Sequence, residues 1–349
     1  MYTIILGARP DLSTFAPVPG RGFFGSKPPI EMQVALPASE VAEEQITALQ
    51  SLGATMSESW TGLRPQTVRI LGDQVSIGEV LPQVMLTQPP ASDELSTWIG
   101  LDDVNLAPVA FDLEKIGPYF IILGPPEGGK TTALATIALA LGFACSHLRF
   151  RAVLFSPKRG EVYPLDSLAK LPHVVGLSKS ERSFDELLIQ LENEVESREQ
   201  ARDGAERARA HMMLAIDDYH LVANRLDPKL IERLERLVRH GPDLGITTVL
   251  SLPTTVASSL MDPIIRLVKS WRNGLWLSST ESTEAASMGV RIPLNLRNKA
   301  MPPGRGFLFS PSSQILLQVA SPESTGSGEQ GHPSSLGSWV EAILKRGTG

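Results

Sequence analysis

The sequence predicts an α/β fold in which helices flank a mostly parallel central sheet on both faces. Residues 124–132 read Gly-Pro-Pro-Glu-Gly-Gly-Lys-Thr-Thr and match the pattern G-x-x-x-x-G-K-[ST] at every fixed position. A short apolar run at residues 120–123 precedes them, and an alanine- and leucine-rich stretch follows from Thr131. This order of strand, glycine-rich loop and helix is the context that a phosphate-binding loop requires. A second apolar run, residues 212–216, ends in two aspartates and indicates a further buried strand of the same sheet.

The loop carries the residue types that hold a nucleoside triphosphate. Its glycines let successive backbone N–H groups face one point, and the following helix N-terminus adds partial positive charge. Lys130 would reach the β- and γ-phosphates of ATP, and the Thr131 hydroxyl would ligate Mg²⁺. The predicted nucleotide contacts are Gly124, Glu127, Gly128, Gly129, Lys130, Thr131 and Thr132. The alternative is a glycine-rich turn that binds nothing.

The two aspartates would complete the site. Asp217 would hold Mg²⁺ together with Thr131, and Asp218 stands where an ATPase keeps the group that polarises the attacking water. Asp217 follows Lys130 by 87 residues (217 − 130), a spacing that fits a RecA-like P-loop NTPase. Ser251 follows the apolar run 246–250 and is the second predicted catalytic residue, since a polar side chain there could sense the γ-phosphate. The alternative for Ser251 is a cap or turn at a strand end.

Asp218 also bears on the rate of hydrolysis. Aspartate is one methylene shorter than glutamate, so its carboxylate falls short of a water placed for in-line attack. A misplacement of about 1 Å can cost roughly a hundredfold in rate. The sequence therefore predicts ATP binding with slow hydrolysis.

A broken repeat marks the two ends of the chain. Pro-Gly-Arg-Gly occurs at residues 19–22 and 303–306, an offset of 284 residues (303 − 19), and similar apolar segments follow at 32–37 and 316–322. A shared strand after the same turn favours a duplicated unit over a chance turn composition. The first copy has no phosphate loop upstream in this sequence. It is therefore interpreted as the tail of a preceding repeat.

The predicted organisation has four parts. These are the tail of a preceding ATPase repeat (1–37), a connecting helix and strand segment that packs on the core (38–97), the ATPase core (98–322), and a flexible linker with a short C-terminal helix (323–349). Inside the core, Ser183 with Glu186 predicts a capping box ahead of a long helix from residue 184 to about 202.

Composition limits the class of protein. Arg9 and Asp11 interrupt the first apolar run, so no signal peptide is expected. The most apolar stretch, residues 131–145, is too short to span a bilayer. The single cysteine, Cys145, excludes an internal disulfide framework and favours a reducing compartment. A net charge of −6 argues against a surface built to hold nucleic acid, and no nucleic-acid partner is expected.

Taken together, these residues resemble the FtsK/SpoIIIE-type ATPases, and in particular the last ATPase domain of the EccC/EssC motors of type VII secretion. The resemblance runs through most of residues 19–322, and its most discriminating segments are Ile-Gly-Leu-Asp-Asp at 99–103 and Asp-Asp-Tyr-His-Leu-Val-Ala at 217–223. It implies two partners: Esx-type helical-hairpin secretion substrates, whose export signal the domain receives, and neighbouring ATPase repeats of the same chain. It also implies a soluble domain at the cytoplasmic face of the cell membrane, with membrane contact only through an upstream part of the chain.

Three functions remain open on the sequence. The favoured one is a nucleotide-binding, substrate-receiving domain of a secretion ATPase, and the others are a DNA-translocating motor and a non-hydrolysing module locked by ATP. DNA-translocating relatives carry a Thr-Gln-Arg-Pro type segment where this chain has Ser-Leu-Pro-Thr at 251–254, and a winged-helix domain where only 27 residues (349 − 322) follow residue 322. No arginine finger can be named from the sequence: Arg159, Arg272, Arg291 and Arg305 are all candidates, and surface solvation is the favoured role for each.

Overall fold

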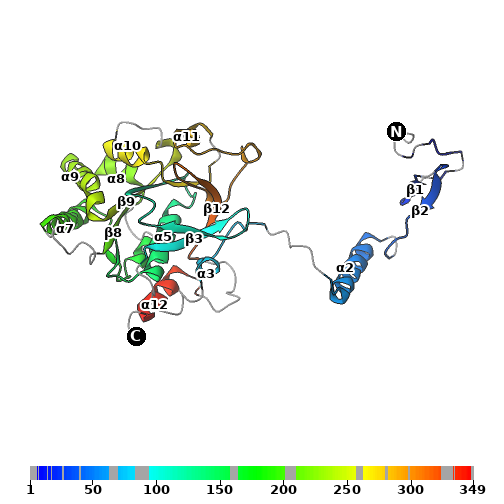
Figure 1. Ribbon diagram of the computed structural model, residues 1–349, viewed down its shortest axis with the longest axis horizontal. Helices are drawn as coiled ribbons and strands as arrows, with labels where there is room; N and C mark the ends of the chain where they lie inside the picture. The colour runs from blue at the N-terminus through cyan, green and yellow to red at the C-terminus, as the bar shows by residue number, and fades with distance from the viewer. Residues whose placement is uncertain are drawn as a thin grey trace. The chain divides into compact units, whose positions relative to one another are not determined.

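The structure, a computed structural model, describes most of the chain. The described residues are 6, 8–13, 15–16, 18–25, 27–38, 41–62, 70–82, 94–157, 164–200, 210–256, 262–279, 282–297, 299–323, 333 and 335–346. The chain divides into two compact units, residues 1–68 and 69–349, and each is described by itself (Figure 1).

The first unit contains an antiparallel hairpin and one helix. Strand β1 (Arg21–Phe24) pairs with β2 (Ile30–Gln33), and α2 (Ala42–Ser59) follows. Along α2 the side chains of Ile46, Leu49 and Met56 recur at helical spacing and are more than half exposed. The helix buries none of its residues, although its apolar stripe is of the kind that normally faces a core.

The second unit is built on a ten-stranded sheet in the order β4-β3-β12-β11-β10-β5-β9-β8-β6-β7. Six adjacent strands run parallel: β5 (Tyr119–Leu123), β6 (Phe150–Phe155), β7 (Val174–Ser178), β8 (His211–Ile216), β9 (Ile246–Leu252) and β10 (Gly274–Leu277). Four antiparallel strands extend the sheet: β3 (Ser96–Asp102), β4 (Pro108–Asp112), β11 (Arg305–Phe309) and β12 (Gln314–Val319). The predicted fold class, a mostly parallel central sheet of the RecA-like type, is confirmed.

Helices cover both faces of this sheet (Figure 1). They are α3 (Ile77–Val80), α5 (Lys130–Ala144), α6 (Leu165–Leu168), α7 (Glu181–Gln200), α8 (Tyr219–Arg225), α9 (Pro228–His240), α10 (Pro263–Ser270), α11 (Ser282–Ser287) and α12 (Leu336–Arg346). Side chains of a strand alternate between faces, and in β5 Phe120 and Ile122 join a hydrophobic cluster with α5 and α12. The other β5 residues join a second cluster with α7, α9 and α10. Two buried faces explain why β5 is apolar at every position.

The boundary between the units falls inside the segment expected at 38–97. The C-terminal part of that segment does belong to the core, where Leu71, Val75 and Ile77 are buried. Helix α2, which lies in the N-terminal part of the same segment, belongs with the hairpin to the first unit. At the other terminus, α12 buries Leu336 and Trp339 in the core cluster that contains α5, so this helix is an integral part of the second unit.

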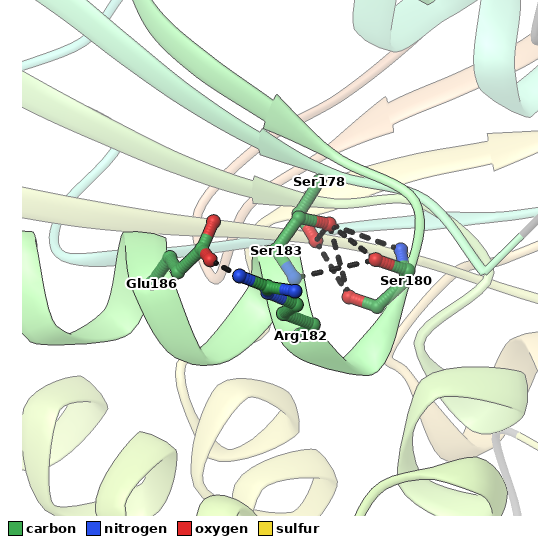
Figure 2. A network of polar contacts seen from close by, with 5 residues as sticks. All are labelled: Ser178, Ser180, Arg182, Ser183 and Glu186. Carbon is green, nitrogen blue, oxygen red and sulfur yellow. Dashed lines mark hydrogen bonds and ion pairs between the residues drawn. The ribbon is translucent and has the colours of Figure 1, made fainter.

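The predicted capping box is wrong. Helix α7 begins at Glu181, ahead of Ser183, because Ser180 stands before the helix and exchanges hydrogen bonds with Ser183 (Figure 2). The Ser183 hydroxyl also lies 2.9 Å from that of Ser178 at the end of β7. Glu186 instead accepts a hydrogen bond from Arg182 at 3.1 Å, the i,i+4 pairing that a helix surface favours. These contacts fix the turn between β7 and α7.

Among the helices in the described ranges, none combines the length and the apolar character that crossing a bilayer demands.

Candidate nucleotide-binding site

The predicted phosphate loop joins the carboxyl end of β5 to the first turn of α5. Gly129 precedes the helix with φ at 91°, and Glu127 has φ at 59°, so the chain turns twice through the left-handed region. Gly128 is buried between them. The backbone N–H groups of the first turn of a helix have no intrahelical acceptor. This geometry leaves Lys130, Thr131 and Thr132 on the turn that opens at the loop.

The Lys130 side chain lies against the loop. It is only 8% exposed, and its Nζ donates hydrogen bonds to the carbonyl oxygens of Gly124 at 3.1 Å and Pro125 at 2.8 Å. An ammonium held in this way is already oriented within the loop, which lowers the entropy cost of engaging a phosphate.

The residues proposed to hold Mg²⁺ meet in the fold. The Thr131 hydroxyl lies 3.1 Å from both carboxylate oxygens of Asp217, although the two residues are 86 positions apart. Asp217 is fully buried at the end of β8. A hydroxyl and a carboxylate are oxygen ligands of the kind that Mg²⁺ uses with substrate phosphates and water. Within the described chain no group of three or more His, Cys, Asp or Glu side chains could hold a metal. The hydroxyl and carboxylate oxygens fit an ion whose other ligands are phosphate oxygens and water.

Ser251 binds both aspartates. Its hydroxyl donates to Oδ1 of Asp217 at 2.7 Å and accepts from the backbone N–H of Asp218 at 2.7 Å. Strand β9 continues through Ser251 to Leu252, so the residue is neither a cap nor a turn. Asp218 has φ at 45° and precedes α8. The structure thus brings Thr131, Asp217 and Ser251 into contact, and Ser251 also holds the backbone of Asp218.

A second element contacts the loop from the neighbouring strands. The backbone N–H of Gly304 donates to the Gly128 carbonyl at 3.0 Å. The Ser278 hydroxyl lies 3.0 Å from the carbonyl oxygens of Gly128 and Pro302 and can donate to either. A Cβ on Gly129 would lie 2.8 Å from the Gly304 nitrogen, so this approach requires a glycine. We call Ser278 and the turn at residues 302–305 the loop brace.

Arg305 extends the brace to the start of the second unit. Its Nη2 donates to the carbonyl oxygens of Leu71 at 3.1 Å and Gly72 at 2.7 Å, and its Nε donates to Gln318 Oε1 at 3.0 Å. These contacts give the Arg305 guanidinium a structural role inside this domain. Of the other arginines considered as fingers, Arg272 and Arg291 are exposed, and Arg159 lies outside the described residues.

His220 lies beside this cluster on α8. Burial is the main cause that lowers the pKa of its imidazole. The charges of Asp218 and Asp217 raise this pKa, and the charge of Lys130 lowers it further. Its Nδ1 atom is buried and has no hydrogen-bond acceptor or donor within the described part of the chain. A lowered pKa favours the uncharged form of this imidazole, which lies close enough to Lys130 and Asp217 to feel their charges.

Comparison with known proteins bears on this site. No family model matches the chain. The chain is 26% identical to the ESX secretion system protein EccC of Thermomonospora curvata over 321 residues, which are 88% of this chain and 23% of that protein. It is 30% identical to the ESX-4 secretion system protein EccC4 of Mycobacterium tuberculosis over 242 residues, 66% of this chain and 19% of that protein.

A solved structure extends the likeness to the fold. It is the Thermomonospora curvata EccC structure (ATPases 2 and 3) in complex with a signal sequence peptide, with a TM-score of 0.60 and 25% identity over 88% of this chain and 54% of that chain. The chain belongs to the EccC/EssC family of type VII secretion ATPase domains. This EccC/EssC domain spans about a fifth of the length of the two curated relatives.

Sequence reasoning did not find every residue of the site. The Pro-Gly-Arg-Gly motif was visible as a repeat, but its place on the phosphate loop depends on the pairing of β11 with β10. Ser278 has φ at 53°, and no local pattern marks it. His220 lies within a segment that the resemblance already singled out, where its proximity to Asp217 was the available signal.

We expect Ser278→Ala to weaken ATP binding by about threefold to tenfold, because one hydrogen bond that holds the loop is worth roughly 1 kcal/mol. Titration calorimetry with ATP·Mg²⁺ measures this, and thermal unfolding without nucleotide should change little. Ser312→Ala, on an exposed serine in the connection between β11 and β12, is the control. Equal affinities for the Ser278 variant and the parent would show that the hydroxyl does not position the loop.

Proposed function

We propose that this domain binds ATP·Mg²⁺ between the phosphate loop and the end of β8, and that it does so within a type VII secretion machine. The meeting of Thr131 with Asp217 carries the proposal, because a hydroxyl from the loop and a buried carboxylate from a neighbouring strand are the two protein ligands that P-loop ATPases offer to Mg²⁺. The family relationship gives the setting.

Each residue of the site has a proposed role. Lys130 and the backbone N–H groups of the loop bind the β- and γ-phosphates, with Gly124, Glu127, Gly128, Gly129 and Thr132 shaping or flanking that cradle. Thr131 and Asp217 hold Mg²⁺, which when bound neutralises charge on the phosphate oxygens. Asp218 orients the attacking water, and Ser251 positions the turn that carries it.

Lys130→Ala should remove ATP binding, because the charge facing the phosphates is lost. Calorimetric affinity is the measurement. Lys170→Ala, at an exposed lysine, should bind as the parent does. If the Lys130 variant keeps the affinity of the parent, the assignment of the site is wrong.

Hydrolysis in the isolated domain should be slow, with turnover below roughly 1 s⁻¹, the lower end for working enzymes. The reason is the short side chain of Asp218, whose backbone N–H is held by the Ser251 hydroxyl just before α8. Asp218→Glu should raise turnover by up to about a hundredfold at unchanged ATP affinity. Phosphate release under saturating ATP gives the rates, and parent turnover above this limit without a partner would contradict slow hydrolysis.

We further propose that the domain receives the export signal of Esx-type helical-hairpin substrates. The EccC structure with a signal sequence peptide supports a receptor function for domains of this family. A pocket of about 830 Å³ beside the nucleotide site has the chemistry for it. Its lining comes from the carboxyl ends of β6 and β7 and from α7 and α8 rather than from the phosphate loop.

The lining of the pocket combines apolar and basic side chains. Phe155 and Phe184, which are buried, and Leu221, which is partly buried, form what we call its apolar floor, and the basic residues are Lys179 and the exposed Arg225. The serine contacts at the β7–α7 turn fix one wall (Figure 2). An amphipathic segment binds through apolar anchors in such a groove, and a chain with a net charge of −6 suits a peptide better than a nucleic acid.

A peptide with the C-terminal signal of the cognate substrate should bind with micromolar affinity, and scrambling its apolar positions should remove binding. Leu221→Asp should weaken binding at least tenfold, because it places a charge in the apolar floor. Leu148→Asp, at an exposed leucine on another surface, is the control. Fluorescence anisotropy of the labelled peptide measures all four cases, and equal affinity for native and scrambled peptides would exclude a receptor function.

The remaining parts of the chain are proposed to serve the same machine. Residues 1–37 form the tail of a preceding ATPase repeat, 38–97 connect it to the ATPase core at 98–322, and 323–349 are a linker and terminal helix. Neighbouring repeats of the same longer protein are the second partner. The domain would work at the cytoplasmic face of the membrane, with membrane contact only through upstream sequence.

A further inference from the structure

The N-terminal hairpin repeats the β11–β12 hairpin in its pairing and in its side-chain contacts. Arg21 pairs with Gln33 as Arg305 pairs with Gln318, and the following strand positions match in register. In the first hairpin the arginine Nε donates to the glutamine Oε1 at 3.3 Å, and in the second at 3.0 Å. The duplication therefore includes how these two side chains interact.

The turns that precede the two hairpins also match. Gly20 has φ at 80° and Gly304 at 78°. In both hairpins the glycine carbonyl accepts a backbone N–H at 2.9 Å, from Val34 and Val319 respectively. The glutamine Nε2 donates to the proline carbonyl at the start of each turn, at 3.1 Å in the first and 2.8 Å in the second. The turn that forms part of the loop brace is thus present twice.

The two copies differ in what they contact. A Cβ on Gly306 would overlap the Trp276 carbonyl of β10, so the neighbouring strand requires a glycine there. The equivalent residue, Gly22, has no heavy atom within 4 Å of the same point. The first hairpin has kept a glycine that suits a close neighbouring strand, whereas within the described residues β1 pairs only with β2.

Burial shows the same contrast. Leu317 and Val319 are 0% and 4% exposed, whereas their equivalents Met32 and Val34 are 40% and 54% exposed. An isolated two-stranded hairpin is marginally stable in water, and an open strand edge invites pairing. The face of β1–β2 that corresponds to the buried face of β11–β12 is therefore exposed.

In this chain, the sheet edge that such a hairpin would pair with is already covered by β11–β12. Strand β11 covers the edge of β10, and the turn at 302–305 contacts the phosphate loop. A second copy of the chain would carry the same covered edge. The occupant must be a different phosphate-loop domain, one whose sheet ends in an open strand equivalent to β10.

We propose that β1–β2 is the loop brace of such a domain: β1 extends its sheet, and the Pro19–Gly20–Arg21 turn closes on the glycines of its phosphate loop. The partner is an ATPase domain that precedes this one, so the inference rests on the proposed function and deepens it. The chain then contributes to two nucleotide sites. It carries the phosphate loop of one and supplies the brace of the other.

A graft tests whether the first hairpin can act as a brace. Residues 303–319 of the full chain are replaced by a copy of residues 19–34, and ATP·Mg²⁺ affinity is measured by calorimetry. The graft should bind within threefold of the parent, and the same graft with valine at the glycine copied from Gly20 should bind at least tenfold more weakly. A folded graft that binds tenfold more weakly than the parent would overturn the proposal. If the graft does not fold, the triple variant Leu308→Phe, Leu316→Glu, Leu317→Met, which keeps the native loop, decides by the same thresholds.

A matched pair of point variants tests where each hairpin acts. Gly304→Val should weaken the binding of ATP by this chain at least tenfold, whereas Gly20→Val should leave it within twofold, because that hairpin serves another domain. A tenfold loss in Gly20→Val would show that the first hairpin acts on this chain's own loop and would overturn the proposal. Binding of ATP by the parent in the same assay distinguishes failure of the proposed function from failure of this inference. If the parent does not bind ATP, the proposed function is wrong. If the parent binds ATP but the graft fails, only the role of the first hairpin is wrong.

Discussion

A buried carboxylate organises the nucleotide site. Asp217 accepts hydrogen bonds from Thr131 on α5 and from Ser251 on β9, and the Ser251 hydroxyl in turn accepts the backbone N–H of Asp218. A carboxylate that is fully excluded from water is stable only when its oxygens are satisfied. The hydrogen bonds that satisfy the Asp217 carboxylate therefore hold strands β8 and β9, the start of α5 and the start of α8 in one arrangement.

The sequence predicted the parts of this site that are local in the chain. A glycine-rich loop after an apolar strand has few structural alternatives, so β5, the loop and the start of α5 follow from residues 120–132. The run that ends at Asp217 and Asp218 is equally explicit, because a continuous apolar strand indicates burial on both faces. Ser251 was found, but not its contacts, since those depend on the adjacency of β8 and β9.

Features that depend on the order of strands were not accessible from the sequence. The hairpin β11–β12 lies between β10 and β3, and this insertion puts Gly304 on the phosphate loop. The periodicity of a sequence predicts strands but not which strands are neighbours. Pro-Gly-Arg-Gly therefore indicated a turn and a repeat, but not the contact of that turn with the phosphate loop. The start of α7 differs from the prediction because of local contacts. Ser180, ahead of the helix, accepts the backbone N–H of Ser183, and Glu186 accepts a hydrogen bond from Arg182.

Arg305 connects the start of the second unit to the residues that contact the phosphate loop. Its guanidinium holds the carbonyl oxygens of Leu71 and Gly72, where the chain enters the second unit, and its backbone carbonyl accepts the N–H of Ser278, which contacts Gly128. Coupling between two sites is reciprocal in free energy. A change in how residues 71 and 72 are held would therefore reach the phosphate loop through one residue, and a shift of the loop would reach those residues by the same route.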